Sequence, residues 1–110
     1  MKLPNADKAR IDKTKITEYL LSKSHPDGCS KASFFYQFGF TVENWEIFAQ
    51  SLHKHAIEND VAKMVESEYG SRYSIEGNLE TPDGRNPEVR STWIIEKHSA
   101  IPRLITAHPK

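Results

Sequence analysis

The fold is decided by the stretch TVENWEIFAQSLHKHAIEN, residues 41–59. Its apolar side chains recur at helical spacing and predict one amphipathic helix over residues 43–59, with Thr41 as the cap at its start. The apolar face comprises Trp45, Phe48, Ala49, Leu52 and Ala56, and the opposite face carries Glu43, Glu46, Gln50, Lys54 and Glu58. This pattern is typical of a helix that lies on a sheet with its back to water. We expect its large apolar residues to pack against the strand residues Ile75, Trp93 and Ile95.

Two shorter helices are predicted before this stretch. Asp12 is a good N-cap for a helix over residues 13–23, in which Ile16, Tyr19 and Leu20 form one apolar stripe. The sequence SHPDG, residues 24–28, then breaks the pattern with proline and glycine. Ser30 can cap a second helix over residues 31–38, and Gly39 follows where a helix-ending glycine is expected.

After residue 60 the apolar period changes from helical to about two. Turn signals at residues 70–71 and 82–84 divide this part into predicted strands over residues 63–69, 72–79, 88–97 and 103–107. Helices followed by consecutive strands with short turns favour an α+β fold. We therefore predict one domain, residues 1–110, with N-terminal helices packed on one face of a four-stranded antiparallel meander sheet.

Composition and charge exclude several classes of protein. Fifteen basic and fifteen acidic residues cancel, which argues against binding nucleic acid through bulk charge, although local patches remain possible. No stretch is apolar enough to span a bilayer, and the N-terminus lacks the apolar segment of a secretory signal. The sequence is therefore expected to act in the cytoplasm, either alone or as a module of a larger exported protein.

Neither a metal nor a cofactor is predicted. Cys29 is the only cysteine, so no internal disulfide or thiolate zinc cluster can form, and we expect this thiol to be buried and inert. His53 and His55 are two residues apart on a helix and point to different faces, so they cannot chelate one ion together. The sequence also lacks the glycine-rich motifs of nucleotide cofactor sites.

Several stretches resemble a small uncharacterised bacterial domain family. They are LPNADK at residues 3–8, HP at 25–26, Lys31 with FF at 34–35, LETPDGR at 79–85 and TW at 92–93. Members of that family occur as lone small proteins and as modules near toxin or phage-related proteins. The predicted order of helices and strands is also similar to that of the barnase, EndoU, colicin and RelE group of small ribonucleases. That second resemblance is topological, and it implies a ribonuclease without assigning catalytic residues.

The first candidate site is the segment before the second helix. Metal-free RNA cleavage needs a base for the 2′-hydroxyl, an acid for the leaving oxygen and cations or amides for the phosphorane charge. His25 precedes a predicted helix start and lies six residues before Lys31, so an imidazole, an ammonium group and free amides could face one phosphate. The alternative is a loop histidine beside proline, with Lys31 solvated on the helix.

The second candidate site lies on the sheet. Arg90 and Thr92 share one face of the third strand, and Thr106 and His108 share a face of the last strand. If these strands are neighbours, the four side chains form one polar patch, and we expect His25, Lys31, Arg90, Thr92 and Thr106 to serve catalysis. The alternative is the ordinary polar surface of an uncovered sheet face.

Two functions fit this pattern. The first is a metal-independent endoribonuclease of the bacterial toxin type, with RNA as substrate and a cognate antitoxin or immunity protein as partner. The second is a non-catalytic protein-binding module, such as an antitoxin, an immunity protein or a phage-assembly adaptor. A basic cleft with His25 and Arg90 would favour the enzyme, and an exposed apolar patch on the sheet edge would favour the binding module.

Overall fold

The computed structural model describes residues 1–110 and has the α+β architecture that the sequence predicts. The helical elements are η1 (Ala6–Lys8), α1 (Lys13–Lys15), η2 (Ile16–Leu20), α2 (Cys29–Tyr36) and α3 (Trp45–Glu58). The strands are β1 (Val61–Ser67), β2 (Gly70–Asn78), β3 (Glu88–Glu96) and β4 (Arg103–Pro109). All pairings are antiparallel and the strand order is β1-β2-β3-β4, so the sheet is a meander.

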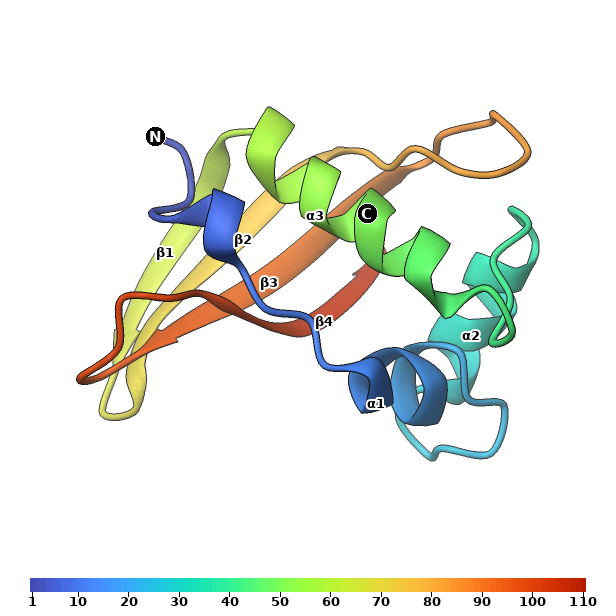
Figure 1. The fold of residues 1–110 in the computed structure, drawn as a ribbon, viewed down its shortest axis with the longest axis horizontal. Coiled ribbons are helices and arrows are strands. Elements are labelled where there is room, and N and C mark those ends of the chain that lie inside the picture. Colours follow the sequence, from blue (N-terminus) through green and yellow to red (C-terminus); the bar gives the residue numbers. More distant parts are fainter.

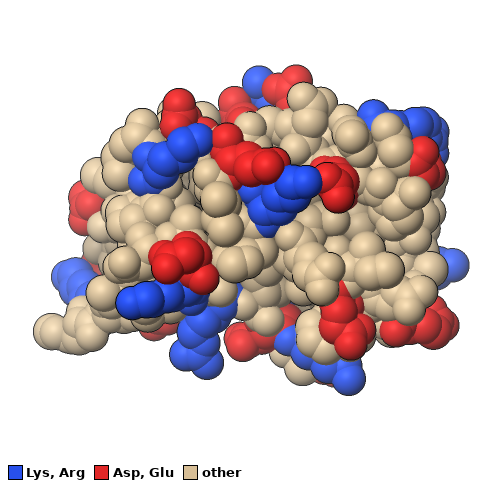
Figure 2. Space-filling view, turned by 45° about the horizontal axis from the view of Figure 1, so that its top comes forward, with Lys and Arg blue, Asp and Glu red and all other residues tan.

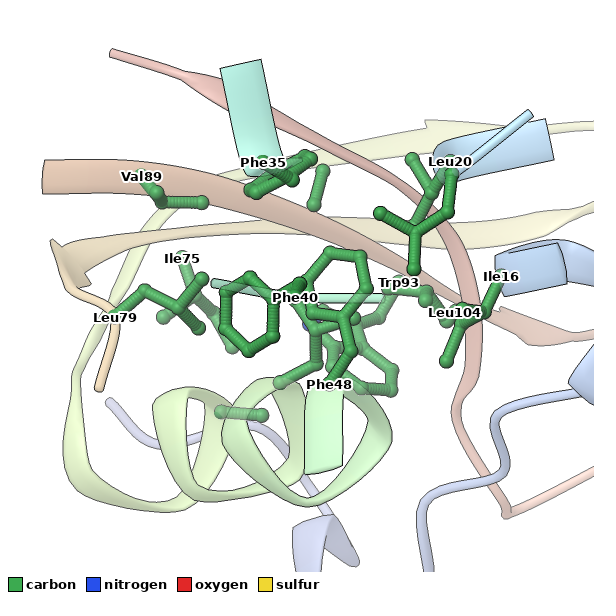
Figure 3. Packing of buried hydrophobic residues seen from close by; sticks show 14 of the residues in the cluster. Ile16, Leu20, Phe35, Phe40, Phe48, Ile75, Leu79, Val89, Trp93 and Leu104 are labelled. Atoms are coloured by element: carbon green, nitrogen blue, oxygen red, sulfur yellow. The ribbon is translucent and has the colours of Figure 1, made fainter. Parts of the chain in front are cut away.

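The helix α3 lies across the sheet, and α1 and α2 stand beside one end of it (Figure 1). A single cluster of 16 buried residues fills the space between these layers. Its aromatic centre is Phe48 of α3, whose ring centroid lies 4.4 Å from that of Phe40 and 4.7 Å from that of Phe35 (Figure 3). Ile75 and Trp93 contribute from the sheet and are fully buried. The expected packing of this helix on the sheet is confirmed for Phe48 and Leu52.

Trp45 departs from that expectation. Its ring is only partly buried at the margin of the core, with the Lys13 ammonium 5.5 Å from the ring centroid. Trp45 is the first residue of α3, whereas the sequence predicted a start two residues earlier. Thr41 caps the preceding turn instead, where its Oγ1 accepts a hydrogen bond from the Asn44 amide at 3.1 Å.

The first two helices also differ from their predicted forms. The predicted helix over residues 13–23 is one short α-turn followed by the π-helical η2, in which the Leu21 amide donates to the Ile16 carbonyl at 2.8 Å. Helix α2 begins at Cys29, before the predicted cap Ser30. The prediction of a buried thiol is wrong, because Cys29 is exposed in the first turn of α2.

Three further features complete the description of the fold. The β2–β3 connection is held by hydrogen bonds between Thr81, Asp83 and Asn86, with Gly84 at a φ of 80°. None of the helices combines the length and the apolar character needed to cross a bilayer. On the face that Figure 2 shows, positive and negative side chains are interspersed and neither sign forms a continuous patch.

Candidate functional site

The face of the sheet opposite α3 carries a polar hollow of about 240 Å³. Register explains its floor, because Thr92 pairs with Thr106 across β3 and β4, and Arg90 pairs with His108 in the same two strands. Side chains two residues apart on a strand share a face, so these four residues point to the same side. The polar lining consists of Lys63, Arg72, Ser74, Arg90, Thr92 and His108.

All of the charged side chains that line this hollow are positive, although the net charge of the whole chain is zero. Lys63, Arg72 and Arg90 line it and no carboxylate does. Arg90 is bound by Glu76 at the margin, with a distance of 2.8 Å from its Nε to Oε2. Lys63 and Arg72 have no ion pair. Their charges are therefore free to bind an anion.

Glu76 forms ion pairs with two cations beside the hollow. Its carboxylate accepts from Arg90 and lies 3.2 Å from the Lys110 Nζ. Hydrogen bonds from these two groups hold the pKa of Glu76 below its usual value. Glu76 stays ionised in this position, so Arg90 is anchored and presents a fixed guanidinium to the hollow.

A second cluster forms around Tyr19 at the β4 edge. The Tyr19 hydroxyl hydrogen-bonds with Thr106 Oγ1 at 3.0 Å. His25 meets the Tyr19 ring edge to face, with centroids 4.9 Å apart. The ammonium groups of Lys31 and Lys15 lie 5.4 Å and 5.1 Å from the centroid of the same ring. Tyr19 thus joins the loop before α2 to the sheet.

Close packing fixes the loop that carries His25. A Cβ added to Gly28 would lie 2.1 Å from the Tyr19 carbonyl oxygen, so only glycine fits there. His25 Nδ1 accepts hydrogen bonds from the amides of Asp27 and Gly28, at 3.0 Å and 3.1 Å. Because Nδ1 is an acceptor, the ring proton of neutral His25 is on Nε2. This side chain therefore offers an N–H donor and no free lone pair.

His108 has the opposite tautomer. Its Nδ1 lies 3.1 Å from the Pro109 carbonyl oxygen, which can only accept, so the proton of the neutral ring is on Nδ1. The Nε2 lone pair is left free to take a proton. His108 also lines another hollow, of about 330 Å³, beside Ser30 and Lys31, so it borders both this hollow and the one on the sheet.

The structure brings the predicted residues together in two groups. His25 and Lys31 meet around Tyr19, and Arg90 and Thr92 line the hollow on the sheet. Thr106 connects them, because it contacts Tyr19 and pairs with Thr92. No direct contact joins His25 to Arg90.

The positions of Tyr19 and His108 in these clusters are not evident from the sequence. The spacing predicts Tyr19 in an apolar stripe, and its hydroxyl is the available signal that one end of the side chain requires a polar partner. The alternation of β4 places His108 on the same face as Thr106 but does not give its neighbour on β3. The register that sets it opposite Arg90 depends on the β4 bulge, which no local pattern reveals.

The donor set lacks the features of a metal site. No group of three or more histidine, cysteine, aspartate or glutamate side chains is close enough to hold an ion. The residues that converge are cations, hydroxyls and imidazoles, which suit an anionic ligand with a transferable proton.

Comparison with known proteins identifies a family and a shared fold. A family model described as a domain of unknown function (DUF6883) matches residues 2–110. A similar chain occurs in a solved structure described as a contact-dependent growth inhibition toxin - immunity protein complex from Klebsiella pneumoniae 342. That chain has a TM-score of 0.72 and 20% sequence identity, over 91% of this chain and 98% of the other. No curated protein matches the sequence.

Proposed function

This chain belongs to the DUF6883 family of domains of unknown function, and from that premise we propose that it is a metal-independent endoribonuclease of the bacterial toxin type. The observation that carries the proposal is the basic hollow on the sheet, in which His108 keeps a free lone pair beside Arg72 and Arg90. A hollow in which two cations without an ion pair, Lys63 and Arg72, lie near a histidine fits a ligand with phosphate groups. The fold is shared with one chain of a toxin - immunity protein complex, which supports a part in a toxin system, as toxin or as immunity protein.

In the proposed reaction His108 is the general base. Its Nε2 takes the proton of the RNA 2′-hydroxyl, and the 2′-oxygen attacks the adjacent phosphorus. Arg72, Lys63 and Arg90 stabilise the charge of the phosphorane. The bond from phosphorus to the 5′-oxygen breaks, and that oxygen receives a proton from the Tyr19 hydroxyl. The products are a 2′,3′-cyclic phosphate and a free 5′-hydroxyl.

The other predicted residues take supporting roles. Lys31 and the Nε2–H of His25 provide positive charge and a donor at the phosphate, and Thr106 orients the Tyr19 hydroxyl. The two amide hydrogen bonds to Nδ1 favour a donor role for His25 over that of a general base. Thr92 supplies a hydroxyl on the floor of the hollow.

Cleavage of total bacterial RNA in excess EDTA tests the proposal. We expect cyclic phosphate ends, and we expect His108→Ala to lower the rate by about 100-fold or more, the range for a lost general base. His98→Asn is the matched control, because His98 is exposed in the β3–β4 turn at a φ of 70°, which asparagine tolerates. Expression of the intact chain in bacteria should arrest growth, and His108→Ala should relieve the arrest.

A non-catalytic protein-binding module is the second candidate. The observation that favours it is the edge strand β1, on which Met64 and Val65 are 48% and 43% exposed. An unpaired strand edge can accept a strand from another protein. If the intact chain neither cleaves RNA in EDTA nor arrests growth, the ribonuclease proposal is wrong and the binding module replaces it.

A further inference from the structure

A second hollow, of about 650 Å³, adjoins the proposed catalytic hollow on the same face of the sheet. Arg72 lines both, so the two hollows lie side by side, and together they are called the trough. The second hollow runs from Arg72 towards the β1–β2 turn, where Tyr69 stands at its wall. A volume of this size is within the range of small-molecule sites, about 300 to 1,000 Å³.

The floor of this hollow is apolar, although it lies on the open face of the sheet. Ile94 of β3 is only 8% exposed, and Ile105 of β4 lies beside it. Ile105 is the extra residue of a β-bulge, since Thr92 pairs with Thr106 and Trp93 pairs with Leu104. Bulges re-aim side chains next to functional sites. Here the bulge adds a second branched side chain to the floor.

The walls of the hollow are suited to a flat ring with polar edges. Tyr69 is 70% exposed and joins none of the aromatic pairs of the protein, so its ring is free to stack on a ligand. Across the hollow, Arg103 donates through Nε to Glu96 Oε1 at 3.0 Å. This pair leaves guanidinium N–H groups and a carboxylate oxygen available to the edge of a base.

We propose that this second hollow is a nucleobase subsite, which holds one base of the RNA next to the phosphate that is cleaved. The inference rests on the proposed ribonuclease function. The ligand class follows from the trough as a whole, because a nucleotide combines a flat apolar face with an adjacent anion. Arg72 binds the phosphate between the two hollows, Tyr69 stacks on the base, and Ile94 and Ile105 contact its other side.

Binding of short oligonucleotides with single abasic positions tests the subsite. The probes are 2′-O-methyl RNA hexamers, which cannot be cleaved, in an intact form and in a series that removes one base at a time. For the parent protein, we expect one position at which the missing base weakens binding about tenfold, as loss of an aromatic stack does. For Tyr69→Ala, removal of the base at that same position should no longer weaken binding. Tyr69→Phe should behave like the parent protein, because it keeps the ring.

Controls separate failure of the subsite from failure of the proposed function. Ile57→Ala is the matched surface variant, since Ile57 is 44% exposed on α3, away from the trough. If RNA cleavage persists but no abasic position couples to Tyr69, the subsite is wrong and the ribonuclease proposal stands. If the parent protein neither binds the hexamers nor cleaves RNA, both proposals are wrong.

Discussion

At the scale of single residues, His55 shows how a histidine can serve the core and not the chemistry. Its Nε2 lies 3.1 Å from the Gly77 carbonyl oxygen and 3.0 Å from that of Val89. Carbonyls only accept, so Nε2 carries the proton, and Nδ1 accepts from the Ser91 hydroxyl at 2.9 Å. Ser91 in turn accepts from the Trp93 indole N–H at 2.9 Å. Every polar atom of this buried network is satisfied when His55 is neutral.

The network predicts that the protein loses stability in mild acid. Burial lowers the pKa of His55 below its usual value, despite the two carbonyls that favour the charged form. Between the folded pKa and the unfolded value of about 6.5, the unfolded chain binds more protons. The free energy of unfolding should therefore fall as the pH drops below about 6.5, by up to about 1.4 kcal/mol for each unit of pKa difference. Urea denaturation at pH 7.5 and at pH 5.0 measures the change.

The control for this prediction is the neighbouring histidine. His55→Gln should be less stable than the parent protein at pH 7.5 and should lose part of the dependence on pH. His53→Gln should keep it, because His53 is only partly buried and makes one hydrogen bond, to the Ala6 carbonyl. Equal pH dependence in the parent protein and in His55→Gln would contradict the assignment.

Among the secondary-structure elements, α3 contributes unequally to stability along its length. Phe48 is fully buried between two other aromatic rings, whereas Trp45 lies at the margin of the core and Ile47 is 45% exposed. Phe48→Ala should lower the free energy of unfolding by about 3 to 5 kcal/mol, the usual cost of a large core cavity. Trp45→Ala should cost less than Phe48→Ala, because fewer of its atoms leave water on folding. Ile47→Ala should stay within about 0.5 kcal/mol of the parent protein.

Thermal and urea denaturation of the three variants measure this order. A Trp45→Ala variant that is as unstable as Phe48→Ala would contradict the structure and would restore the packing that the sequence suggested.

The helix α3 and its apolar face were predictable, because 14 residues of regular spacing leave little ambiguity. The position of its first residue was not, since Thr41 could cap either a helix or the turn before it.

For the other elements, too, the sequence pattern predicts the type of secondary structure but not its detailed geometry. The meander was predictable because the apolar period shortens to about two after residue 60 and each turn contains glycine or proline. The π-helical turn at η2 was not, because Ile16, Tyr19 and Leu20 have the same spacing in an α-helix. The candidate site divides in the same way: His25 and Lys31 are close in sequence, whereas Tyr19 and Thr106 are 87 residues apart and meet only in the folded chain.

For the molecule as a whole, the net charge and the local charge of the trough give different predictions for the binding of RNA. The chain has a formal charge of zero, and one face shows interspersed signs (Figure 2). The proposed trough instead collects Lys63, Arg72 and Arg90 on the opposite side of the sheet from α3. Binding of RNA should therefore depend on salt, because local cations release counterions from phosphates whatever the net charge.

The salt dependence gives a count of the cations that bind phosphate. For single strands, the slope of log K against log salt is about −0.7 for each phosphate neutralised. Replacing both Lys63 and Arg72 with glutamine should make the slope less steep by about 1.4. The matched control is Lys8→Gln, because Lys8 is an exposed lysine in η1, which contacts α3. Fluorescence titration of a labelled 2′-O-methyl hexamer between about 50 and 200 mM salt measures each slope. If Lys8→Gln changes the slope as much as the double variant, RNA binds through diffuse charge and the trough has no special role.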